Sequence, residues 1–188
     1  MKKIFKITLL TILITLMVFS IVGCKEVDDK TAISIANSLI KQSYELNVIY
    51  FGEGLDKQET DDDSDLYVPV AGSSNYTSYL ALANRTREIF SEAYSNSIIS
   101  LAFNGESGAI GSEAIYARYI EFEGYLSVRR DIEGIEIAKY DFTTTELVKN
   151  SSRFIIVKVK AINTDKPEYV EITLINEDNG WRIDSATY

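Results

Sequence analysis

The chain has one cysteine and no histidine, and these two counts decide most of the chemistry that its side chains could do. Without histidine there is no Ser/His or Cys/His catalytic pair, no imidazole general base and no imidazole-bound zinc. Carboxylate chemistry stays open, because the chain has 28 Asp and Glu residues. So many carboxylates bring some pairs together by chance, and the sequence nominates no catalytic pair. We therefore expect a non-catalytic protein with no cofactor and no metal site.

The single cysteine, Cys24, follows an apolar segment near the N-terminus. Lys2, Lys3 and Lys6 precede or open this segment, and no charged residue occurs from Ile7 to Val22. These 16 residues are fewer than the roughly 20 that cross a bilayer as a helix. The pattern favours a secretory signal peptide over a membrane span. The alternative interpretation is an uncleaved signal anchor with a buried free cysteine.

The residues Ile21-Val22-Gly23-Cys24 resemble a bacterial lipobox. In lipoproteins with this motif, the thiol that corresponds to Cys24 receives a diacylglyceryl group, and the signal peptide is cut between Gly23 and Cys24. The resemblance implies a signal peptide at 1–23 and a lipid anchor at the extracytoplasmic face of the cell membrane. Each buried methylene contributes about 0.8 kcal/mol, so two acyl chains hold a protein firmly at a bilayer. A lipidated Cys24 leaves no thiol for a disulfide, a nucleophile or a metal site.

Removal of residues 1–23 would make an acidic chain more acidic. The net charge of −9 would become −12, because Lys2, Lys3 and Lys6 leave and no acidic residue goes with them. Nucleic-acid phosphates and anionic headgroups repel such a surface, so we expect no nucleic-acid partner. A basic protein partner or a cation-rich envelope would suit the charge, although an acidic surface also serves solubility alone.

The remaining 165 residues suffice for one domain with its own core. Residues 24–30 are expected to form a short tether, and residues 31–188 the domain. Apolar residues recur at helical spacing from Thr31 to Tyr50, which predicts one long amphipathic helix. Two shorter helices are expected next, one capped by Thr77 or Ser78 and one capped by Ser91 that ends at Asn104-Gly105.

An acid-rich segment, residues 53–65, separates the first helix from the second. Its alternating carboxylates invite comparison with a calcium-binding loop. The comparison fails because Leu66 stands where the loop needs a glycine, and Gly72 stands where it needs a bidentate glutamate. A solvated loop is the default interpretation, with contact to a basic partner as the alternative. The candidate partner-contact residues are Asp61, Asp62, Asp63 and Asp65.

The period of the apolar residues changes from 3.6 to 2 after Ala114, which predicts strands. Glu123-Gly124 is a turn signal within the first pair of strands. Consecutive strands with tight turns predict an antiparallel meander, so the expected fold class is α+β, with three helices packed on a curved antiparallel sheet. The expected strands are 115–122, 125–130, 135–147, 153–162, 168–176 and 181–187. On the strand 153–162, Ile155, Val157 and Val159 are expected to face the core.

The helices and the strand meander that ends in Asn179-Gly180-Trp181-Arg182-Ile183-Asp184 resemble the cystatin-like and nuclear-transport-factor-two-like folds of bacterial lipoproteins. This resemblance implies that the helix 31–50 lies across the concave face of the sheet. A narrower resemblance is to secreted inhibitors of cell-wall D,L-endopeptidases, and it implies an envelope enzyme as partner. It rests on the segments 43–51, 90–100 and 119–126.

The tyrosines allow two interpretations, because twelve of them exceed what a small core usually requires. On strands they stabilise a sheet through cross-strand pairs, and in a cleft or interface they offer amphipathic contact area. Five fall on expected strands: Tyr116, Tyr119, Tyr125, Tyr140 and Tyr169.

Three functions therefore fit the sequence. The first is a lipid-anchored, non-catalytic binding or regulatory module that acts on an envelope protein. The second, a special case of the first, is an inhibitor of cell-wall D,L-endopeptidases. The third is a small-ligand binder or carboxylate-dependent enzyme in the cleft of the sheet. We favour the first, because the chain is acidic and aromatic and lacks the residues that most catalysis uses.

Overall fold

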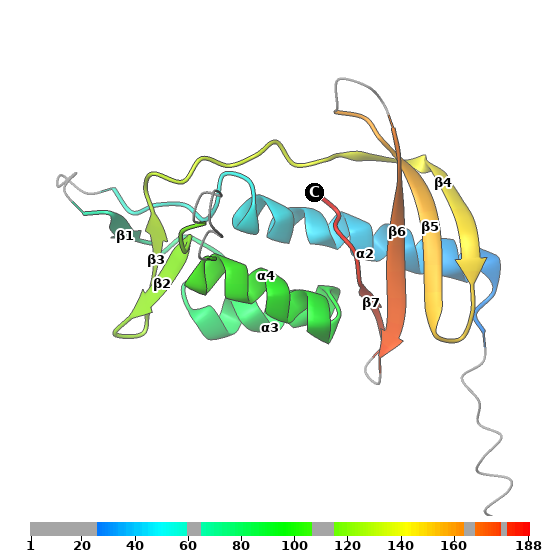
Figure 1. Ribbon diagram of the computed structural model, residues 1–188, viewed down its shortest axis with the longest axis horizontal. Helices are drawn as coiled ribbons and strands as arrows, with labels where there is room; N and C mark the ends of the chain where they lie inside the picture. The colour runs from blue at the N-terminus through cyan, green and yellow to red at the C-terminus, as the bar shows by residue number, and fades with distance from the viewer. Residues whose placement is uncertain (1–25, 60–64, 107–114, 164–167, 178–179) are drawn as a thin grey trace, which may run out of the picture.

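One long helix, α2 (Asp29–Tyr50), runs along the long axis of the molecule and joins two antiparallel sheets (Figure 1). The computed structural model describes residues 26–59, 65–106, 115–163, 168–177 and 180–188. Two further helices, α3 (Tyr79–Ile89) and α4 (Glu92–Asn104), lie side by side below the C-terminal half of α2 in Figure 1. The expected α+β class with helices packed on a sheet is confirmed.

The helices begin and end at residues whose side chains satisfy free backbone groups. The carboxylate of Asp28 accepts a hydrogen bond from the Thr31 N–H at 3.1 Å, so α2 begins two residues before the expected start. Ser78 and Ser91 cap α3 and α4, as expected from the sequence. α4 ends at Asn104 before Gly105, which has a φ of 67° that favours glycine.

The strands form two sheets and not one continuous meander. Strands β4 (Tyr140–Asn150), β5 (Phe154–Ala161), β6 (Tyr169–Glu177) and β7 (Gly180–Ile183) pair in sequence order. The hairpin of β2 (Tyr119–Phe122) and β3 (Tyr125–Arg129) pairs with β1 (Tyr67–Pro69) in a separate sheet of order β1-β3-β2.

The segment between the two sheets explains the separation. The expected strand 135–147 begins only at Tyr140, because the Ile135 N–H donates to the Phe51 carbonyl at 2.8 Å and not to a neighbouring strand. Gly134 passes against the end of α2 so closely that a Cβ there would lie 2.0 Å from the Gly52 carbonyl oxygen. The chain thus leaves one sheet and crosses the end of α2 before it enters the other.

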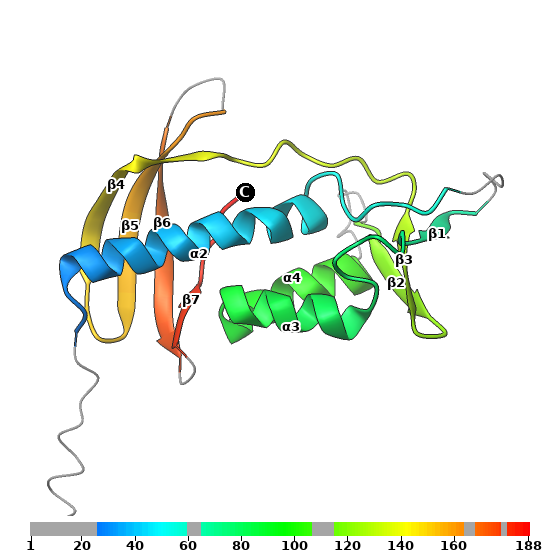
Figure 2. The ribbon, with the colours of Figure 1, turned by 180° about the vertical axis from the view of Figure 1, so that it is seen from behind.

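The four-stranded sheet packs one face on α2, as Figure 2 shows from behind. On β5 the residues Ile155, Val157 and Val159 are fully buried, which confirms the expected core face. They pack in one cluster with Ala36 and Ile40 of α2. Strand β4 has two register irregularities against β5, and such bulges bend a sheet.

Tyr119 fixes the three-stranded sheet to the other end of α2. Tyr119 of β2 is completely buried, and its hydroxyl donates to the Ile49 carbonyl at 2.7 Å and accepts from the Leu55 N–H at 3.1 Å. Buried Leu126 and Val128 of β3 share its core cluster. Within the residues described, none of the helices has the length and apolar character that crossing a bilayer requires.

Candidate functional site

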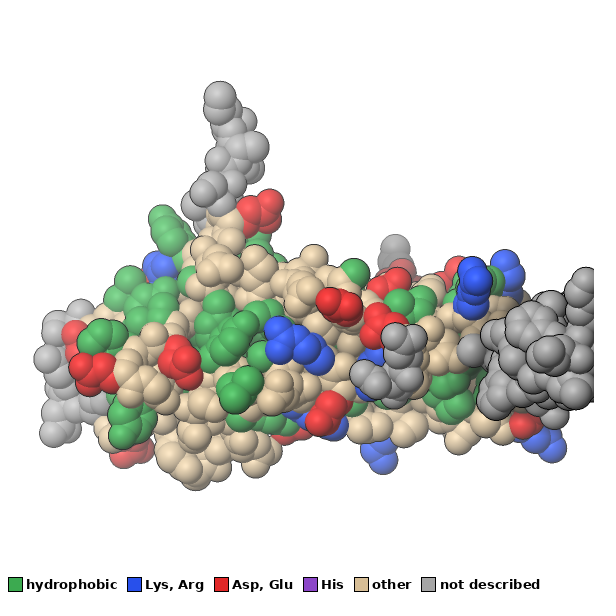
Figure 3. All heavy atoms as spheres, turned by 90° about the horizontal axis from the view of Figure 1, so that it is seen from below, with side chains coloured by type: hydrophobic (Ala, Val, Ile, Leu, Met, Phe, Trp, Pro, Cys, Tyr) green, Lys and Arg blue, Asp and Glu red, His purple; other side chains and the backbone are tan. Residues whose placement is uncertain are grey.

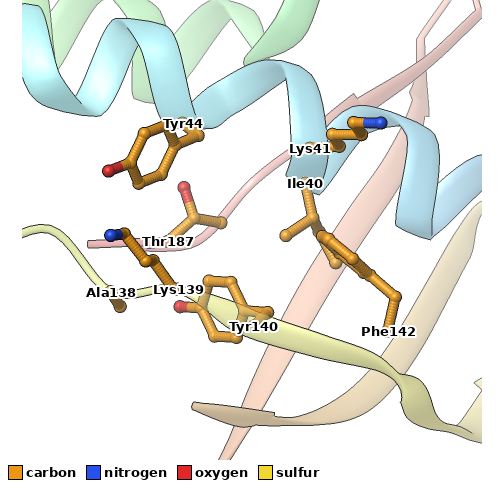
Figure 4. A pocket seen from close by; sticks show the side chains of 8 residues that line it. All are labelled: Ile40, Lys41, Tyr44, Ala138, Lys139, Tyr140, Phe142 and Thr187. Atoms are coloured by element: carbon orange, nitrogen blue, oxygen red, sulfur yellow. The ribbon is translucent and has the colours of Figure 1, made fainter. Parts of the chain in front are cut away.

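A cleft of about 500 Å³ opens between α2 and the start of β4 (Figure 4). This volume is in the range of small-molecule sites. Its floor contains Ile40 and Thr187, which are almost completely buried, whereas Tyr44 and Lys139 are exposed at its mouth. The lining residues are Ile40, Lys41, Tyr44, Ala138, Lys139, Tyr140, Phe142 and Thr187.

A buried polar network fixes the wall that Thr187 forms. The Asn47 side-chain amide donates to the carbonyl and to Oγ1 of Thr187, both at 2.8 Å. Ser43 and Thr187 share a hydrogen bond of 3.0 Å between their hydroxyl oxygens. Ser43 and Asn47 lie one helical turn apart on the buried face of α2. They hold the segment after β7 against the helix and so close one side of the cleft.

The cleft has a polar side and an apolar side. The ammonium group of Lys139 lies on the same side as the hydroxyl groups of Tyr44, Tyr140 and Thr187, whereas the ammonium group of Lys41 points away (Figure 4). Ile40 and Phe142 form the apolar side. An ammonium group beside hydroxyl donors favours an anion, and the apolar side favours a hydrophobic body.

The hydroxyl of Tyr140 is available as a hydrogen-bond donor to an anion at neutral pH. Burial raises the pKa of Tyr140 to about 12, so its hydroxyl stays protonated and able to donate. Neither Lys41 nor Lys139 forms an ion pair with any residue that the structure describes. Of the two lysines that line the cleft, Lys139 faces its hydroxyl side, and no carboxylate of the described residues is paired with it.

A second hollow of about 380 Å³ shares Tyr44 and Lys139 with the cleft and has the opposite charge. Glu53 and Glu136 line it, and both are exposed. No Asp or Glu of the described segments is among the buried residues. The described segments also contain no group of three or more acidic side chains placed to hold a metal ion.

The structure places few of the site residues that the sequence nominated. Gly23 and Cys24 lie outside the described residues, and so do Asp61, Asp62 and Asp63. Asp65 is described and exposed.

Basic residues surround the base of the acidic segment. The Leu66 carbonyl accepts from the Arg130 N–H, and Lys57 Nζ donates to the Arg130 carbonyl at 3.3 Å. Arg129 and Asp131 form an ion pair there with a 2.5 Å contact, which lowers the pKa of Asp131. This end of the small sheet is therefore less uniformly acidic than the sequence suggested, and the contact role of Asp61, Asp62, Asp63 and Asp65 stays a prediction.

The five strand tyrosines divide between the two interpretations. Tyr119 belongs to the core, Tyr140 lines the cleft and Tyr125 is 72% exposed. Tyr116 precedes β2, and its ring lies 4.1 Å from the Arg129 guanidinium carbon. Tyr169 carries the Lys158 ammonium over its ring at 4.9 Å.

The segment Trp181-Arg182-Ile183-Asp184 has a structural role. The Ile183 carbonyl accepts from the Ser91 N–H at 2.8 Å, and Asp184 accepts from the Ser91 hydroxyl. Arg182 Nε donates to the Arg87 carbonyl at 3.0 Å. These bonds fasten the junction of α3 and α4 to the edge strand of the larger sheet.

Tyr44, Lys139 and Thr187 were missed as site residues by the sequence interpretation. Tyr44 lies within the helix expected from Thr31 to Tyr50, and it is 38% exposed at the mouth of the cleft. Lys139 sits within an expected strand, and Thr187 is placed by bonds to residues about 140 positions earlier. No protein-family model and no curated protein matches the chain.

Proposed function

We propose that this chain is a lipid-anchored, extracytoplasmic binding module without catalytic activity, and that the cleft between α2 and β4 binds a small amphipathic anion. The observation that carries the proposal is the position of the Lys139 ammonium beside the hydroxyl groups of Tyr44 and Tyr140 and opposite Phe142 and Ile40. The ligand class is a molecule with one carboxylate, sulfonate or phosphate group on an aromatic or aliphatic body.

Binding fits the cleft better than carboxylate catalysis. The lining supplies ammonium groups, hydroxyls and apolar surface and includes no Asp or Glu, whereas the exposed Glu53 and Glu136 line the neighbouring hollow. A general acid needs a carboxyl group whose pKa is raised. Among the carboxyl groups of the described segments, those with a shifted pKa belong to Asp28, Asp131 and Asp141, and in each of them the pKa is lowered.

The lipid anchor supports the location and stays part of the proposal. Cys24 and the preceding Ile21-Val22-Gly23 carry it, and α2 begins only a few residues later, at Asp29. A short tether would hold the cleft near the outer face of the membrane. Replacement of Cys24 by serine should abolish palmitate labelling and release the protein from the membrane; palmitate labelling that persists in this variant would exclude the anchor.

The cleft is tested with two fluorescent probes that differ mainly in charge. The probe 8-anilinonaphthalene-1-sulfonate carries an aromatic body and one sulfonate, and N-phenyl-1-naphthylamine has a similar body without charge. Lys139→Met should weaken binding of the sulfonate about tenfold, which corresponds to about 1.4 kcal/mol, and should leave the neutral probe unchanged.

Lys41→Met is the matched control, because it removes the same charge from a cleft residue whose ammonium group points away. Its affinity for both probes should stay within a factor of two of the wild type. If Lys41→Met and Lys139→Met lost equal affinity for the sulfonate, the effect would come from net charge alone, and the assignment of Lys139 as the anion-binding residue would be overturned. Saturable binding of neither probe by the wild type would also overturn it.

A further inference from the structure

A group of exposed apolar side chains lies at the end of the molecule that carries the small sheet. Its members are Leu80, Phe122 and Tyr125, which are 63%, 68% and 72% exposed, and we call them the apolar tip. Figure 3 shows apolar side chains gathered over this end, around the β2–β3 hairpin and the helices beside it. Clustered apolar groups with this exposure mark interaction surfaces more often than core packing.

The hairpin turn places the two aromatic residues of the apolar tip opposite each other on neighbouring strands. Phe122 and Tyr125 are register partners, and φ is 51° at Glu123 and 82° at Gly124. Positive φ at both central residues characterises the two-residue turn that matches the twist of paired strands. Partners in register project from the same face, so both rings point away from the buried Leu126 and Val128.

Two hydrogen bonds fix the start of α3 beside the hairpin. The Tyr79 N–H donates to Glu121 Oε1 at 3.0 Å, and the Leu126 N–H donates to the Thr77 carbonyl at 3.2 Å. Leu80 follows Tyr79 in the first turn of α3, and it is thereby held next to the hairpin. The apolar tip is a preformed surface that needs no folding step to bind.

The charged residues of the hairpin 119–128 are Glu121 and Glu123. The flanking arginines do not offset them: Arg118 is buried and donates to the Gly52 carbonyl, Arg129 is paired with Asp131, and Arg85 is paired with Glu88. An apolar surface with a carboxylate border is complementary to an apolar recess bordered by Lys or Arg. The same carboxylates oppose insertion into an anionic bilayer.

The apolar tip is far from the point where the chain enters the domain. α2 has 22 residues and is about 33 Å long, and its first residue lies at the opposite end of the molecule from the hairpin (Figures 1 and 2). A chain tethered before α2 therefore presents the hairpin at the end away from its tether.

We propose that the apolar tip docks onto a protein that offers an apolar recess bordered by basic side chains. Phe122 and Tyr125 enter the recess, and Glu123 faces the basic border. This interaction uses a surface separate from the cleft, so it goes beyond ligand binding and does not depend on it.

The interaction is tested by photo-crosslinking of the full chain in the cells that make it. Tyr125→p-benzoylphenylalanine places the crosslinker at the apolar tip, and Tyr169→p-benzoylphenylalanine is the control at another exposed tyrosine, on the larger sheet. One protein crosslinked from position 125 and not from position 169 is expected. The purified partner should then bind Phe122→Ser at least tenfold more weakly than wild type, and Glu123→Lys about threefold more weakly. Its affinity for the wild type should fall with added salt.

Three results would overturn the proposal: crosslinks to lipid, crosslinks to a second copy of the chain, or the same products from both positions. The proposal would also be overturned if the partner bound Phe122→Ser and Glu123→Lys as tightly as the wild type. Both variants should keep the wild-type melting midpoint and the wild-type affinity for the naphthalene sulfonate. A variant that loses the partner and still binds the naphthalene sulfonate therefore shows that the two sites act separately. The docking proposal and the ligand-site proposal can then fail independently of each other.

Discussion

The two ends of the molecule are built from antiparallel strands on the same helix, yet one end forms a recess and the other a projection. At the larger sheet, α2 covers the inner face, and Thr187 closes a cleft lined by Tyr140 and Lys139. At the smaller sheet, Tyr119, Leu126 and Val128 fill the inner face, and Phe122 and Tyr125 are left exposed on the other side. The same secondary structure thus serves two kinds of recognition, depending on which face is filled.

α2 connects the two ends through consecutive turns. Ser43 and Asn47 hold Thr187 at the cleft, the Ile49 carbonyl holds Tyr119, and the Tyr50 hydroxyl contacts Thr86 Oγ1 of α3 at 2.7 Å. Because these contacts share one rigid helix, the two ends should unfold together even if they bind different molecules.

The largest effect is expected from Tyr119→Ala. The variant removes a completely buried ring and its bonds to Ile49 and Leu55, and such losses cost about 3–5 kcal/mol of unfolding free energy. Urea unfolding followed by Trp181 fluorescence and by circular dichroism measures it. Since Trp181 lies in the larger sheet, coincident transitions would confirm one cooperative unit. Two separate transitions would show that the two ends of the molecule unfold independently.

A smaller effect is expected from alkaline pH. Burial raises the pKa of Tyr119 from 10 to about 12, so the unfolded chain loses this proton before the folded one does. The stability that this group contributes is complete below pH 10 and falls as the pH rises through the interval to about 12, by on the order of 2–3 kcal/mol. Tyr119→Phe should flatten this part of the stability profile measured between pH 9 and 12. An unchanged slope would show that Tyr119 does not titrate in this way.

Asn47→Ala should cost about 1–3 kcal/mol and act mainly on the cleft. The variant leaves the buried carbonyl and Oγ1 of Thr187 without their amide donor. Affinity for the naphthalene sulfonate should fall severalfold as the wall formed by Thr187 loosens, whereas the crosslink from position 125 should persist. Loss of the crosslink together with the ligand would mean that the two surfaces are not independent.

The smallest effect is expected from changes at the apolar tip. Phe122→Ser should change the unfolding free energy by no more than about 0.5 kcal/mol, because the ring is 68% exposed. Thermal unfolding measures it, with Ile155→Ser on the core face of β5 as the destabilising control. A large loss of unfolding free energy in Phe122→Ser would show that Phe122 and Tyr125 stabilise the hairpin. It would remove the main reason to consider the apolar tip a docking surface.

Local signals gave the parts of the fold that depend on neighbouring residues. The caps at Ser78 and Ser91, the turn at Glu123-Gly124 and the core face of β5 follow from spacing over a few positions. The division into two sheets could not be predicted in this way, because it depends on the Ile135 contact with Phe51 and on the close approach of Gly134 to Gly52.

The cleft could not be predicted from the sequence either, because it also depends on contacts between residues far apart in the chain. Tyr140 was recognised as a residue that could line a cleft, but its neighbours come from α2 and from the last residues of the chain. The bonds from Ser43 and Asn47 to Thr187 and the stacking of Tyr188 on Phe51 bring the last residues of the chain to α2. The apolar tip was foreseen in part, since Tyr125 was one of the five tyrosines considered for an interface, whereas Leu80 reaches it only through the packing of α3 on the hairpin.

The most direct test of the two separate binding ends is a chemical-shift titration of the isotope-labelled domain with 8-anilinonaphthalene-1-sulfonate. Perturbed amides should be those of residues 40–44, 138–142 and 186–188, and residues 119–128 should keep their shifts. Perturbations centred on the β2–β3 hairpin, or an absence of perturbation at residues 138–142, would contradict the assignment of the cleft as the ligand site.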